Sequence, residues 1–446
     1  MAARNLDMTK GSPMPLLIRF ALPLMVGNVF QQLYTVVDTM VVGKALGVGA
    51  LAALGASDWL NWLMLGMVQG LTQGFAVLMA QAFGAREGEQ LRHVTGVSVV
   101  LCMISAGLLV LVGQVFMEPV LRLMQTPQEI FGGAALYLRI MYSGIPVVMA
   151  YNLFSCILRS LGDSRTPLYA MILACGVNIG LDLLFVLVFG WGIAGAASAT
   201  LIAQGASAVF CLLQLRRLED MKLKKAHFRM EWRLIGRLLR LGATMAFQFL
   251  IISIGGLVVQ FVVNGCGVSF IAGFTATNKL YGVLEIAATS FGFAVVTYVG
   301  QNLGAGNIPR IRQGFRTGMV LALGTSLVIA AVMILLGRFI LSGFISGTPE
   351  EVAATMKIAY SYLVIMSACL PVLYVLYLAR SALQGLENAA LPFASGVVEL
   401  AMRVGAAFLL PPLMGETGIF FAEVLAWLGA DLVLVPGYYL TVRKYK

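Results

Sequence analysis

Apolar residues run along this chain in long blocks that short polar connections separate. A hydrocarbon core about 30 Å thick needs about 20 apolar residues per helix, and blocks of that length recur almost from end to end. The pattern predicts an all-α integral membrane protein with twelve transmembrane helices, at residues 15–38, 50–80, 94–116, 133–156, 167–190, 193–214, 238–262, 269–299, 316–341, 357–382, 391–413 and 417–441.

The two halves of the chain resemble each other. A shift of 220 residues places Gln81 on Gln301, and from Pro146 onward a shift of 225 residues places Pro146 on Pro371. An internal repeat in a membrane chain is typical of carriers with two half-bodies around a central site. We therefore expect two pseudo-symmetric six-helix bundles joined by a basic cytoplasmic linker: an N-lobe at 1–214, the linker at 215–237 and a C-lobe at 238–446.

Composition supports a membrane protein. Hydrophobic residues make up 60% of the 446 positions and charged residues only 11%, whereas about half of a soluble protein is apolar and about a quarter is charged. The net charge of +10 does not indicate nucleic-acid binding, because Lys and Arg gather at alternate connections, starting from the N-terminus. This asymmetry predicts a multi-pass protein of the plasma (inner) membrane with both termini in the cytoplasm.

Motifs for other chemistry are absent from the sequence. The six Cys lie in apolar segments without paired spacing, and the two His lie in separate basic loops, so we expect neither disulfides nor a resident metal. No Gly-x-Ser-x-Gly sequence and no Gly-x-x-x-x-Gly-Lys loop occurs, which argues against an intramembrane enzyme and an ATP-driven pump. We expect no cofactor other than a coupling ion, and we expect a monomer.

Ionisable residues inside the predicted spans are costly to bury, so each requires an explanation. Asp38 and Asp182 have no cation within helical reach in sequence, and Asn178 lies one turn before Asp182 on the same helix face. Such oxygens could hold Na⁺, or the carboxyl groups could take up a proton, because burial disfavours their charged form. The alternative is a pair of structural carboxylates bonded to neighbouring polar groups.

The second half carries different ionisable residues. Glu399 and Arg403 are four residues apart, which predicts an ion pair within one helix. Lys279 and Glu285 could line a cavity or pair elsewhere, and Glu423 and Asp431 receive no role. Under the two shifts Asp38 falls on Val258, Asn152 on Tyr377, Asn178 on Arg403 and Asp182 on Ala407, so we expect a symmetric scaffold with asymmetric ion chemistry.

The first span combines a proline with unusual polarity. Pro23 removes a backbone hydrogen bond and favours a bend, and Gln31 and Tyr34 follow it toward Asp38. This helix could couple ion binding to the shape of a cavity, or the bend could be static. The candidate cavity or substrate residues are Gln31, Tyr34, Phe154, Lys279, Tyr281 and Glu285.

Several of these residues together resemble the multidrug and toxic compound extrusion (MATE) transporters. The similarity extends over essentially the whole chain and is carried by Pro23, Gln31-Gln32-Leu33-Tyr34, Val37-Asp38, Gly84-Ala85, Gly304-Ala305, Arg159-Ser160-Leu161-Gly162-Asp163 before Pro167, and Asn178 with Asp182. The resemblance implies two six-helix lobes, a V-shaped central cavity, and antiport of small amphipathic or cationic organic compounds against Na⁺ or H⁺.

The resemblance also implies a set of site residues. The N-lobe cation site of prokaryotic branches matches Asp38, Asn152, Asn178, Asp182 and Thr200, and the helix-1 bend matches Pro23. Other branches use a Glu in the seventh span, but 242–263 contains no acidic residue here. We expect a secondary antiporter that exports drugs or toxic metabolites; the alternative is a lipid-linked saccharide flippase, for which only Lys279 and Arg403 could meet a pyrophosphate.

Overall fold

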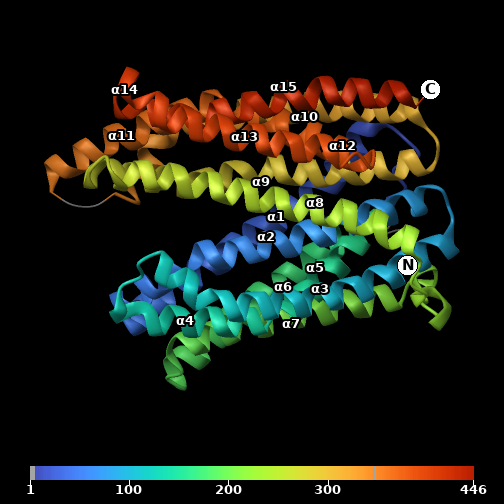
Figure 1. Cartoon of the computed structure of the whole chain (residues 1–446), viewed down its shortest axis with the longest axis horizontal. Helices are drawn as coiled ribbons and strands as arrows, with labels where there is room; N and C mark the ends of the chain where they lie inside the picture. Colours follow the sequence, from blue (N-terminus) through green and yellow to red (C-terminus); the bar gives the residue numbers. More distant parts are fainter. Residues whose placement is uncertain (1–5, 346–347, 446) are drawn as a thin grey trace. The chain divides into compact units, whose positions relative to one another are not determined.

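The computed structural model of the chain describes residues 6–345 and 348–445. Within them the secondary structure is helical throughout, with no strand (Figure 1). The elements of the first half are α1 (Pro13–Leu46), α2 (Val48–Gly84), α3 (Gly88–Leu123), α4 (Gln128–Ser143), α5 (Ile145–Ser160), α6 (Arg165–Asp182), η1 (Leu183–Val188), α7 (Gly192–Arg216), η2 (Glu219–Met221) and η3 (Lys225–Phe228). Those of the second half are α8 (Trp232–Asn264), α9 (Val268–Gly304), α10 (Ile308–Ser342), α11 (Pro349–Ala368), α12 (Leu370–Gly385), α13 (Ala390–Leu409), α14 (Pro411–Met414), η4 (Glu416–Phe420) and α15 (Phe421–Lys444).

Ten helical segments in the described residues are long and apolar enough to cross a membrane, and two bent pairs raise the number to as many as twelve. Each predicted span coincides with one of these segments or pairs. The predicted spans 133–156 and 357–382 are the bent pairs, α4 with α5 at 49° and α11 with α12 at 48°. Pro146 and Pro371 stand at the start of the second helix of each pair, where proline lacks the N–H that would continue the preceding helix.

The backbone repeats with the shifts found in the sequence. Helices α2 and α9 are both 37 residues long, and each follows a glycine with positive φ, 82° at Gly47 and 89° at Gly267. Two further turns share a positive φ although only one member of each pair is glycine. These pairs are Arg86 (60°) with Gly306 (67°), and Gly162 (84°) with Glu387 (62°).

Hydrogen bonds between helices repeat as well. The Ser57 hydroxyl donates to the Ala134 carbonyl at 3.4 Å, and the Thr277 hydroxyl donates to the Ala359 carbonyl at 2.8 Å. These contacts join α2 to α4 and α9 to α11. The duplication is therefore present in packing as well as in sequence.

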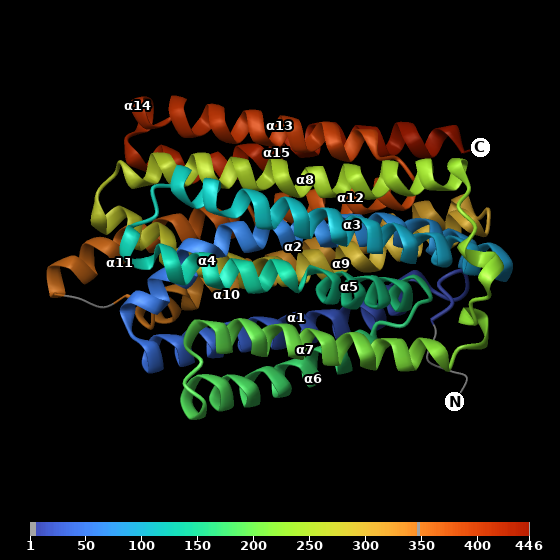
Figure 2. The same cartoon turned by 60° about the horizontal axis from the view of Figure 1, so that its bottom comes forward.

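The chain divides into two compact units, one formed mainly by Leu22–Phe249 and the other mainly by Leu250–Lys446. Thr9–Ala21 belongs to the second unit, so α1 and α8 each contribute to both. In the first unit α6 and α7 pack along each other, and in the second α13 and α15 do so (Figure 2). The lobe and linker boundaries predicted from the sequence stay a prediction.

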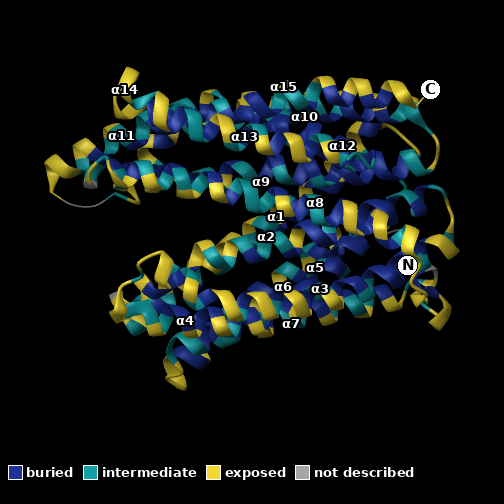
Figure 3. Cartoon of the chain, in the orientation of Figure 1, coloured by how far each residue is buried: buried dark blue, intermediate teal, exposed yellow. Residues whose placement is uncertain are grey.

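Glycines bring α2 and α8 into close contact within the first unit. A Cβ added at Gly70 would lie 2.5 Å from the Ala246 nitrogen, and one at Gly74 would lie 2.5 Å from the Gly242 Cα. Small residues at four-residue spacing allow membrane helices to approach this closely. Away from such contacts the spans expose apolar side chains, as at Leu335, which is 80% exposed on α10 (Figure 3).

A short ordered contact ties the linker to α3. His227 of η3 is buried, and its Nδ1 accepts a hydrogen bond from the Lys224 N–H at 2.8 Å. Its Nε2 lies 2.9 Å from the Glu89 carboxylate, and a Cβ at Gly96 would lie 2.3 Å from the His227 carbonyl oxygen. The imidazole is therefore bonded at both nitrogens, and the backbone of η3 lies against α3.

Candidate functional site

Two buried aspartates lie near each other in the first unit. Asp182 at the end of α6 is fully buried, and Asp38 of α1 is 9% exposed. Their carboxyl groups are close enough to interact electrostatically. Among the described residues, neither Asp182 oxygen has a hydrogen-bond partner, and Asp38 Oδ1 has none. Carboxyl groups buried in this way can accept a proton or ligate a cation.

Amide and hydroxyl groups adjoin this pair. Asn178 Nδ2 donates to Thr200 Oγ1 at 3.4 Å, which links α6 to α7, and Asn178 Oδ1 is buried without a partner in the described part of the chain. Asn152 of α5 is half-buried and donates to the Val148 carbonyl of its own helix at 2.9 Å. The roles of all five predicted cation-site residues stay predictions.

The helix changes its geometry directly after Asp182. Residues Leu183–Val188 form a π-helix, η1, whose wider turn interrupts the regular hydrogen-bond ladder and is frequent at functional sites. All six residues are apolar and include neither Gly nor Pro. Nothing in the sequence therefore signals this change.

Two neighbours of the aspartates were missed in the sequence. Asp58 of α2 interacts electrostatically with Asp38, and the buried Tyr137 of α4 interacts with Asp38, Asp58 and Asp182. Asp58 lies inside the predicted span 50–80, so the cost of burying an ionisable residue could have identified it. Tyr137 has no such signal.

The polar part of α1 faces α7. The Tyr34 side chain hydrogen-bonds with Gln31 and with Gln204 of α7. Pro23 lies inside α1, which continues as one helix from Pro13 to Leu46, so its predicted role in bending stays a prediction. Phe154 is half-buried on α5.

The predicted Glu399–Arg403 ion pair is confirmed, and it belongs to a larger cluster. Arg403 Nη2 lies 3.0 Å from Glu399 Oε1 and 2.7 Å from Glu423 Oε2, and Arg380 Nη2 lies 2.7 Å from Glu399 Oε2. Arg380, Glu399 and Arg403 are 7%, 4% and 4% exposed. Glu423, which the sequence left without a role, is a partner, and Arg380 was missed because its 19-residue separation from Glu399 gives no periodic signal.

The other candidates of the second half separate. Glu285 accepts a hydrogen bond from the Tyr377 hydroxyl, and the Tyr281 ring stacks on Trp427 with centroids 6.0 Å apart. Lys279 is exposed and forms no ion pair with any residue that the structure describes. Glu285 therefore pairs elsewhere and not with Lys279.

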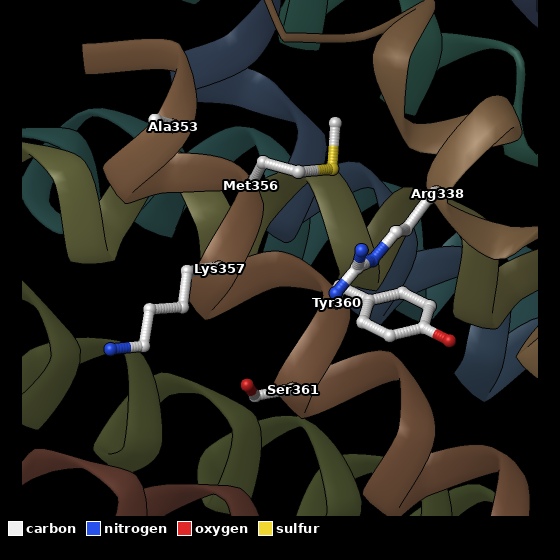
Figure 4. Close-up of a pocket in the computed structure, with 6 residues that line it drawn as sticks. All are labelled: Arg338, Ala353, Met356, Lys357, Tyr360 and Ser361. Atoms are coloured by element: carbon white, nitrogen blue, oxygen red, sulfur yellow. The ribbon is translucent and has the colours of Figure 1, made fainter. Parts of the chain in front are cut away.

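A pocket of about 260 Å³ opens in the second unit between α10 and α11 (Figure 4). The Arg338 guanidinium lies 4.6 Å from the Tyr360 ring centroid, and the Tyr360 hydroxyl donates to the Ile334 carbonyl at 2.8 Å. The lining residues are Arg338, Ala353, Met356, Lys357, Tyr360 and Ser361. None of the predicted site residues is among them.

Metal-ligating side chains do not gather in the described ranges: no group of three or more His, Cys, Asp or Glu residues could hold a metal ion there. All six cysteines are free thiols. A cation at the aspartates would therefore be held by two carboxylates together with amide, hydroxyl or carbonyl oxygens, which suits a weakly bound monovalent ion better than a resident transition metal.

Comparisons with known proteins agree with the repeat. The MatE family model matches the chain twice, at residues 23–184 and 244–409. The chain is 32% identical to the probable multidrug resistance protein YoeA of Bacillus subtilis over 78% of this chain and 75% of that protein. It is 26% identical to the FAD transporter of Shewanella oneidensis over 67% of each.

Solved structures share the fold. An outward-facing multidrug resistance MATE family transporter superposes with a TM-score of 0.92 at 22% identity, over 100% of this chain and 99% of that one. A transporter of the MOP superfamily from Pyrococcus furiosus superposes with a TM-score of 0.93 at 22% identity over the same shares. The twofold family match and the 32% identical relative show that the chain belongs to the MATE family of membrane transporters.

Proposed function

We propose that this protein is a secondary antiporter of the plasma membrane that exports small amphipathic or cationic organic compounds in exchange for Na⁺ or H⁺. Relatives named as multidrug resistance proteins support export of several chemically different compounds. The coupling ion is assigned to the site formed by Asp38 and Asp182, with Asn178 and Thr200 beside it.

One observation carries the assignment: Asp182 is fully buried in a membrane helix and has no hydrogen-bond or ion-pair partner among the described residues. A carboxylate inside the hydrocarbon region needs a compensating charge. Asp38 adds a second carboxyl group that interacts with it, so the two cannot both be ionised at low cost. A proton or a Na⁺ ion supplies the missing positive charge, and its release leaves a state of higher energy.

This difference in energy is what coupling requires. An ion shifts a conformational equilibrium only as far as its affinities for the two states differ. Helix α1 carries Asp38 and, one turn earlier, Tyr34, which bonds to Gln204 of α7. Ion binding at Asp38 therefore acts on the same helix that presents Gln31 and Tyr34 to substrate, and Pro23 gives that helix a point at which to bend.

The flippase alternative receives less support. Its pyrophosphate would have to be met by Lys279 and Arg403, but Arg403 is held by Glu399 and Glu423. The orientation with both termini in the cytoplasm follows from the distribution of Lys and Arg and is part of this proposal. A monomer is proposed as the functional unit.

The test is efflux of a fluorescent cationic dye from vesicles that contain the purified protein, with either a Na⁺ or a proton gradient imposed. One of the two gradients is expected to drive efflux. Asp38→Asn and Asp182→Asn are expected to reduce that efflux to the level of empty vesicles, because a neutral amide needs no compensating ion. Glu129→Gln, which changes an exposed acid of α4, is the matched control. Parental efflux by both aspartate variants would refute the mechanism.

A further inference from the structure

Arg403 occupies the position in the second half that Asn178 has in the first. The shift of 225 residues that relates them also relates the first residues of their helices, Arg165 of α6 and Ala390 of α13. The C-lobe therefore places a permanent cation where the N-lobe places an amide of the proposed ion site.

The same helix pair makes the matching contact in each half. In the first half, Asn178 of α6 bonds to Thr200 of α7 at 3.4 Å. In the second half, Arg403 of α13 bonds to Glu423 of α15 at 2.7 Å. Glycines with positive φ precede α7 and α15 at the same shift, Gly190 and Gly415.

Oxygen ligands surround the Arg403 guanidinium as they would surround a small cation. It contacts one carboxylate oxygen of Glu399 and one of Glu423, and Nη1 donates to the Ile252 carbonyl of α8 at 3.2 Å. Gly255 makes the room, since a Cβ there would lie 2.9 Å from Arg403 Nη1. Helix α8 is the repeat counterpart of α1, so the helix that contributes Asp38 in one half contributes a carbonyl and a glycine in the other.

We infer that the Arg403 guanidinium is a tethered cation that fills the C-lobe counterpart of the proposed ion site. Glu399 and Glu423 would take up a small monovalent cation in its place if that side chain were removed. The inference rests on the proposed function for the identity of the N-lobe site. It explains why one half keeps an exchangeable ion site while the other keeps the same location permanently neutralised.

The charge balance around Arg403 supports the exchange. Glu399 also pairs with Arg380, so without Arg403 two carboxylates face a single guanidinium, and one negative charge is left without compensation. An uncompensated charge buried in a membrane helix bundle is strongly unfavourable. The charged and titratable groups that interact with this cluster are Tyr281 and Glu285 of α9, Tyr362 of α11, Tyr377 and Arg380 of α12, Glu399 and Arg403 of α13, and Glu423 and Asp431 of α15.

The experiment measures the unfolding temperature of purified full-length protein in which Asp182→Asn has removed the N-lobe site. Arg403→Met in this background is compared in choline and Na⁺ buffers at pH 8, and in choline at pH 6. We expect its unfolding temperature to rise by about 2 °C or more with Na⁺ or with acid, because a ligand that binds only the folded state stabilises it. The Asp182→Asn protein with Arg403 intact is expected to show no such rise.

Two matched variants separate ion binding from packing. Arg403→Lys retains a tethered cation, and Arg403→Met with Glu423→Gln removes one negative charge together with the positive one, so both are expected to be independent of Na⁺ and acid. Equal unfolding temperatures of Arg403→Met in all three buffers would overturn the inference. Failure of Arg403→Met to fold in every buffer would also overturn it, since a free cation would then not replace the guanidinium. The readout is stability, so the result stands whether or not Asp182→Asn abolishes transport.

Discussion

Replacing Gly74 with alanine tests the contact between α2 and α8. The added Cβ would lie 2.5 Å from both Cα and N of Gly242, whereas ordinary contact begins at 3.4 Å. The two backbones would have to separate by about 0.9 Å, the difference between these distances. Overpacking of this kind costs about 1–3 kcal/mol, and the higher helix propensity of alanine returns up to about 1 kcal/mol.

We therefore expect Gly74→Ala to destabilise the protein by about 1–2 kcal/mol, measured as a lower unfolding temperature in detergent. Gly55→Ala is the matched control in the same helix, because a Cβ at Gly55 meets nothing within 4 Å. It is expected to leave stability unchanged or raise it by up to about 1 kcal/mol. Equal effects of the two substitutions would refute the reasoning, since only Gly74 faces another backbone.

The remaining predictions concern the buried ion cluster and the linker. Glu399→Gln leaves the buried Arg380 without its 2.7 Å ion pair and is expected to cost about 3–5 kcal/mol, read as a lower unfolding temperature, whereas Glu416→Gln at an exposed position should change it little. His227→Ala removes the bonds from η3 to Glu89 and to the Lys224 N–H, so trypsin should cleave the linker faster than in the parental protein. An unchanged cleavage rate would show that the imidazole does not hold the linker.

The sequence predicts the spans and the repeat because both are recorded in local order. Runs of apolar residues identify the helices, and Pro146 with Pro371 indicates the matched positions that proved to be helix breaks. The Glu399–Arg403 pair was accessible for the same reason, because four-residue spacing fixes which side chains share a helix face.

Contacts between distant segments could not be predicted in this way. Arg380 completes the ion cluster from α12, and Tyr137 approaches the aspartates from α4, yet neither position carries a spacing that points to its partners. The contact between Glu89 and His227 spans 138 residues. Such pairings depend on how the helices cross, which periodicity along one helix does not encode.

The paired turns at Arg86 with Gly306, and at Gly162 with Glu387, bear on the descent of the two halves. A left-handed backbone costs a residue with a Cβ about 1–2 kcal/mol relative to the right-handed one, and glycine is nearly free of that cost. The simplest history is an ancestral half with glycine at both turns, followed by drift to Arg86 in one copy and to Glu387 in the other. Evolution has thus conserved the path of the main chain more strictly than the identity of the residues along it, which left each copy free to acquire its own chemistry.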